Sequence, residues 1–83
     1  MTDTHEVASG NVYEFSHLET GTIRIEIQEL DDPELELWNF EVVSVDYENP
    51  DETNGVYWEG RTVGCRIKET VLQSESHSLV SGE

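Results

Sequence analysis

Apolar and polar residues alternate with a period of two along much of the chain, which is the pattern of β-strands with one buried face. The segment TIRIEIQEL at 22–30 shows it most clearly: Ile23, Ile25 and Ile27 fall on one side, and charged or amide residues fall on the other. The segment at 11–18 alternates in the same way, and Gly21 can supply a tight turn between the two. These segments predict a β-hairpin.

The segment ELELWNFEVVSVDY at 34–47 predicts a third strand, but its apolar positions change phase. One phase contains these apolar residues: Leu35, Leu37, Val43, Val45 and Tyr47. The opposite phase contains Trp38, Phe40 and Val42. A half-buried strand should be polar on that second side, so these three side chains need either a cover or a route into the core.

Two interpretations of the phase change stay open. A straight strand over 35–47 would span about 40 Å, whereas a compact domain of this length is roughly 30 Å across. A β-bulge between Trp38 and Val43 would bend the strand and bring both apolar sets into one core. Alternatively, Trp38, Phe40 and Val42 join Trp58 in an exposed apolar patch with an acidic rim, which is typical of a partner-binding or self-association surface.

After the acidic loop at 48–55, the chain predicts one more strand. A bend near Gly60 would place Val63, Cys65, Ile67 and Val71 on its inner side. No window shows the 3.6-residue period of an amphipathic helix.

The predicted fold is therefore all-β. We expect a small antiparallel meander of four to five strands over residues 11–72 that curls into a barrel or a compact two-sheet sandwich. The polar segment 1–10 and the serine-rich segment 73–83 are expected to be flexible tails.

Net charge adds an expectation about the environment. The 83 residues include 19 Asp and Glu but only 4 Lys and Arg, for a net charge of −15. The Debye length falls from about 8 Å at physiological ionic strength to about 3 Å at 1 M, so concentrated salt would screen the self-repulsion. This composition resembles that of cytoplasmic proteins from extreme halophilic archaea, which implies a salt-adapted cytoplasmic protein.

No motif predicts an enzyme, a cofactor or a metal site. The histidines His5, His17 and His77, together with Cys65, lack the spacing of zinc ligands, and the acidic loops lack the EF-hand pattern. No GxSxG, HExxH or phosphate-binding glycine loop occurs. One cysteine cannot form an intrachain disulfide, and no apolar stretch approaches the roughly 20 residues that span a bilayer.

Two classes of function remain. The first is a non-catalytic interaction or regulatory module that binds a protein, or itself, through the aromatic patch or an exposed strand edge. The second is an acidic inhibitor that mimics nucleic acid, because carboxylates at alternate strand positions lie roughly 6 to 7 Å apart, close to the spacing of phosphates. The acidic surface expected for either class contains these residues: Glu34, Glu36, Asp46, Glu48, Asp51 and Glu52.

Direct binding of nucleic acid or an anionic membrane is not expected for a chain of net charge −15. Single strands could stack on Trp38, Phe40 and Trp58, but too few basic residues are present to follow the phosphates except in concentrated salt.

We predict that KCl stabilises the fold, because it screens repulsion among the carboxylates. Near-ultraviolet circular dichroism should strengthen as KCl rises to molar concentration. A nucleic-acid mimic would instead fold well at low salt and release its basic partner as KCl rises, so full folding at low salt would contradict the salt-adapted interpretation.

Overall fold

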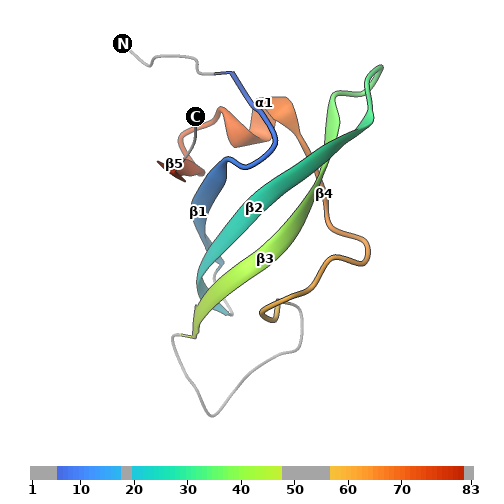
Figure 1. Ribbon diagram of the computed structural model, residues 1–83. Coiled ribbons are helices and arrows are strands. Elements are labelled where there is room, and N and C mark those ends of the chain that lie inside the picture. Colours follow the sequence, from blue (N-terminus) through green and yellow to red (C-terminus); the bar gives the residue numbers. More distant parts are fainter. Residues whose placement is uncertain (1–5, 18–19, 48–56, 82–83) are drawn as a thin grey trace.

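The computed structural model describes residues 6–17, 20–47 and 57–81, which form one antiparallel five-stranded sheet and one short helix (Figure 1). The elements in chain order are β1 (Val12–His17), β2 (Gly21–Asp32), β3 (Leu37–Tyr47), β4 (Arg66–Lys68), α1 (Glu69–Leu72) and β5 (Ser78–Ser81). The order across the sheet is β4-β3-β2-β1-β5. The expected antiparallel β architecture is confirmed. The described strands form a single sheet whose edges, β4 and β5, stay apart, so it is not closed into a barrel.

The inner face of the sheet contains the predicted core of β2. Ile23, Ile25 and Ile27 are fully buried, and β1 places Tyr13 opposite Ile25 and Phe15 opposite Ile23. The predicted hairpin of β1 and β2 is confirmed, because the two strands pair without a break from Val12–Glu26 to His17–Gly21. Branched and aromatic side chains packed across neighbouring strands stabilise such a sheet.

A register shift in β3 resolves the change of phase in the sequence. Val45 pairs with Ile23, and Ser44 pairs with Arg24, but the next partner of β2, Ile25, is Val42. Val43 is therefore the extra residue of a bulge. Beyond it, Val42 and Phe40 turn toward the core, where they are 0% and 7% exposed. The bulged-core interpretation is confirmed for Phe40 and Val42, whereas Trp38 is only partly buried and Leu35 is exposed.

The inner face is covered by segments outside the central strands. Val7, Cys65 and Leu72 are buried together with the strand residues, and Leu72 comes from α1. Figure 1 shows the chain passing from β4 through α1 to β5 at the other edge of the sheet. This short helix corrects the expectation that strand continues to residue 72, and it is the reason that Leu72, rather than Val71, is the buried residue.

Residues near both ends of the described chain extend the domain beyond the predicted range of 11–72. Gly10 N donates to Ile27 O at 2.8 Å, which fixes the segment before β1 against β2. Ser78–Ser81, within the expected tail at 73–83, pair with β1 as β5. A single apolar pair, Leu79 and Val80, was too short a pattern to predict this strand.

The predicted long strand after residue 56 forms only in part. Gly60 and Gly64 both have positive φ, and residues 57–65 make turns instead of a ladder. Three backbone hydrogen bonds still tie this segment to β3, including Val42 N to Arg61 O at 3.0 Å. Val63, expected inside, is 82% exposed because these turns rotate it outward.

We predict that the adjacent residues Val42 and Val43 differ sharply in their contribution to stability. Val42→Ala should lower the free energy of unfolding by about 2 to 3 kcal/mol, because it removes two buried methyl groups and leaves a cavity. Val43→Ala, the matched control at the bulge, should cost less than about 1 kcal/mol. Urea titration of both variants in concentrated KCl would check this, and a larger loss for Val43→Ala would contradict the register.

Candidate interaction surfaces

The free edge of β5 carries no charged residue. All four residues of this strand are exposed, and among the described strands it pairs with β1 alone. Leu79 lies opposite Tyr13 and thus faces the core side of the sheet, while Val80 is the extra residue at a register shift against β1. Leu79 is 45% and Val80 is 44% exposed. Within the described part of the chain, β5 therefore combines an edge that no further strand pairs with and two exposed apolar side chains.

A short polar turn positions β5 against β1. Ser74 Oγ donates to Val71 O at 2.6 Å at the end of α1, and His77 N donates to Ser74 O at 3.3 Å. Ser76 Oγ shares a hydrogen bond of 2.8 Å with His77 Nδ1. The imidazole of His77 then packs on the ring of Phe15, with centroids 4.7 Å apart. His77 is therefore the side chain that anchors the start of β5.

Phe15 and His77 belong to a cluster of four rings at one end of the inner face. Tyr57 meets Phe15 edge-on at 5.7 Å and His17 edge-on at 5.2 Å. Burial lowers the pKa of His77 below its ordinary value, because the charged imidazolium loses solvation there. Nδ1 of His17 is buried and has no hydrogen-bond partner among the described residues. The surroundings of His77 in this cluster therefore favour its neutral imidazole.

The opposite edge of the sheet differs in charge. β4 is only three residues long and carries Arg66 and Lys68 on either side of Ile67, which pairs with Trp38. Basic side chains on a short strand discourage pairing with another strand. Of the two edge strands of the described sheet, β5 is therefore the one without charged residues that discourage pairing.

The outer face of the sheet is polar and acidic. Glu26 of β2 lies directly opposite Glu41 of β3, an arrangement of like charges that costs stability. Arg24 forms an ion pair with Glu14, with 3.0 Å between Nε and Oε1. Because both of these side chains are substantially exposed, the pair contributes little. This face therefore presents mainly carboxylates.

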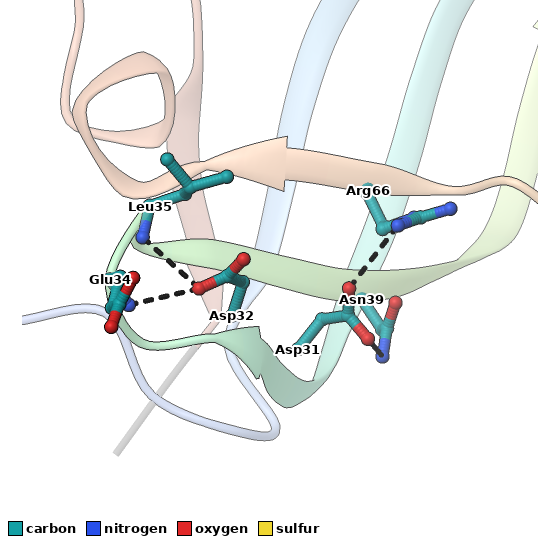
Figure 2. Close-up of polar contacts among 6 residues, drawn as sticks. All are labelled: Asp31, Asp32, Glu34, Leu35, Asn39 and Arg66. Carbon is teal, nitrogen blue, oxygen red and sulfur yellow. Dashed lines mark hydrogen bonds and ion pairs between the residues drawn. The ribbon is translucent and has the colours of Figure 1, made fainter.

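The turn between β2 and β3 is a second acidic region, and it is built on backbone contacts (Figure 2). Asp32 Oδ1 accepts hydrogen bonds from Glu34 N at 3.0 Å and Leu35 N at 3.3 Å, which satisfies the donors of the turn. Asp31 accepts from Asn39 Nδ2 and pairs with Arg66 Nη1, each at 3.4 Å. These two aspartates therefore hold the hairpin and its contact with β4.

The four residues predicted as an aromatic patch do not share one surface. Phe40 and Val42 are buried in the core, and Trp38 packs against that core with Nε1 donating to Glu69 Oε1 at 3.4 Å. Trp58 alone is exposed, at 48%, and the guanidinium of Arg61 lies 5.0 Å from its ring centroid. The patch prediction is thus corrected by the bulge, which turns Phe40 and Val42 inward.

The residues predicted as an acidic surface lie in different places. Glu34 and Glu36 are in the β2–β3 turn, not on a strand, and Glu36 adopts a φ of 54°. Asp46 is exposed near the far end of β3 and pairs with Thr22. The other three predicted acids lie outside the described residues: Glu48, Asp51 and Glu52. The regular strand spacing assumed for Glu34 and Glu36 is absent.

Within the described residues, no group of three or more His, Cys, Asp or Glu side chains is arranged to hold a metal ion. Cys65 is buried, and burial raises the pKa of its thiol more than nearby Arg61 lowers it. A neutral, enclosed thiol is a poor nucleophile, which agrees with its place in the core. None of the helical residues in the described part of the chain forms a segment long and apolar enough to span a membrane.

Sequence reasoning missed Leu79 and Val80. They are the only adjacent apolar pair in the serine-rich segment after residue 72, and that pair was the available signal.

Comparison of the chain with protein-family models, with curated proteins and with solved structures finds no match.

We predict that acid weakens the anchoring of β5 through His77. The folded state lowers the pKa of this ring, so its contribution to stability is present above the unfolded pKa of about 6.5 and is lost as the pH falls through the lower folded pKa. Between pH 7.5 and 5.5, the free energy of unfolding of the wild type should fall relative to that of His77→Gln. Subtracting the two free energies of unfolding removes the contribution of the carboxylates, which both proteins share. A difference that stays constant from pH 7.5 to 5.5 would contradict the prediction.

Proposed function

We propose that this protein is a small, non-catalytic interaction module that binds a partner strand along the free edge of β5. The observation that supports this most directly is an exposed edge strand without charge, Ser78–Ser81, on a chain of net charge −15. An added strand would satisfy the outward backbone groups of β5 and cover Leu79 and Val80. The partner is therefore a protein.

The acidic surface has a supporting role in this proposal. Carboxylates on the outer face and in the β2–β3 turn keep the domain soluble in concentrated salt and repel anionic surfaces. A salt-rich cytoplasm is the environment that we propose from the composition. Nucleic-acid mimicry is less well supported, because Glu34 and Glu36 lie in a turn that lacks the spacing of a phosphate backbone.

We predict that Leu79→Asp abolishes partner binding without unfolding the domain. A carboxylate placed between two strands must lose its hydration, and a cost above about 1.4 kcal/mol reduces affinity more than tenfold. Leu79 is 45% exposed in the isolated chain and does not belong to the buried core, so circular dichroism in concentrated KCl should be unchanged.

The measurement is affinity capture from the source cells at their native ionic strength, with bound protein quantified by mass spectrometry. Leu35→Asp is the matched control, because it makes the same chemical change at an exposed leucine in the β2–β3 turn. The wild type and Leu35→Asp should recover the same partner, and Leu79→Asp should recover at least tenfold less. Equal recovery by all three proteins would contradict the proposed function.

A further inference from the structure

We infer that the strand added to β5 is β5 of a second copy of this chain, which pairs antiparallel about a two-fold axis. The inference rests on the proposed function and names its partner. Two five-stranded sheets would then join into one ten-stranded sheet. Such an interface is isologous, because each copy contributes the same residues.

Charge is the first argument for a second copy. In two-fold pairing a strand meets its own sequence, so a charged residue near the axis would lie close to its equivalent. Each of the other four strands contains at least one charged residue, whereas Ser78–Ser81 contains none. At the other edge of the sheet, pairing of β4 with itself would bring Arg66 and Lys68 together. Among the described strands, β5 is therefore the one suited to meet its own copy.

The register is the second argument. Leu79 lies opposite Tyr13 in regular pairing, and its side chain therefore faces the core side of the sheet. A two-fold axis centred on Leu79 would place it against Leu79 of the second copy and place Ser78 against Val80. The two leucines would then extend the apolar inner face of each sheet across the interface.

The absence of carboxylates on β5 also argues against a basic partner. A basic strand would gain attraction from the acidic outer face or the β2–β3 turn, not from this edge. Binding of a second copy and binding of a basic partner would also respond to salt in opposite directions. Two copies of a chain with charge −15 repel each other at low salt and associate when the charge is screened, whereas a basic partner dissociates.

Sedimentation velocity of the purified full chain at 0.1 M and 2 M KCl tests the inference. We expect the wild type and Leu35→Asp to be monomers at low salt and dimers at high salt, and Leu79→Asp to remain monomeric in both. A disulfide trap then tests the register. Leu79→Cys should form an intermolecular disulfide on oxidation in 2 M KCl, because residues directly opposite in an antiparallel pair have Cα atoms about 4.5 to 5.5 Å apart, within the range that a disulfide spans.

Two controls accompany the trap. Wild type, whose only thiol is the buried Cys65, and Leu35→Cys should form no such disulfide. A wild type that stays monomeric at 2 M KCl overturns the inference. If Leu79→Asp still abolishes capture of a different protein, the proposed function survives with another partner. If neither dimerisation nor capture depends on Leu79, both are overturned.

Discussion

The extra residue in β3 determines what lies inside this protein. Without the bulge at Val43, the side chains of Trp38, Phe40 and Val42 would face the acidic side of the sheet, and the inner face would lose the residues opposite Ile25 and Ile27. A shift of one residue exchanges the two faces of a strand, so this single position decides between a core and an exposed apolar band. The N-terminal half of β3 becomes core only because of this shift.

The need to cover the inner face of the sheet determines where the remaining elements lie. The described residues form one sheet, and short pieces cover its inner face: Val7, Cys65 and Leu72. The connection through α1 carries the chain from the β4 edge to the β1 edge, and this path leaves β5 as the last strand. The exposed edge is therefore a consequence of how the core is covered.

Sequence patterns were sufficient to predict the central strands but not the short elements at the edges of the sheet. Strict alternation identified the inner residues of β2 and its hairpin with β1, and the phase change located the bulge between Trp38 and Val43. Strand length alone did not require the bend, because the longest extent of the molecule is 38 Å and the 11 residues of β3 span only about 36 Å. Short elements such as α1 and β5 depend on tertiary contacts rather than local pattern, so β5, the main part of the candidate site, was not predicted.

Soluble proteins commonly protect strand edges with local charges, but in the described sheet one edge strand, β4, carries charges and the other, β5, does not. β4 carries basic residues, while β5 has only the general repulsion between chains of charge −15. That repulsion acts over a Debye length, about 10 Å at 0.1 M salt, and shrinks to about 3 Å at 1 M. In the salt that would stabilise the fold, the long-range protection of β5 is therefore lost. A chain adapted to such salt needs something to cover this edge, and pairing with an identical edge does so without introducing an opposing charge.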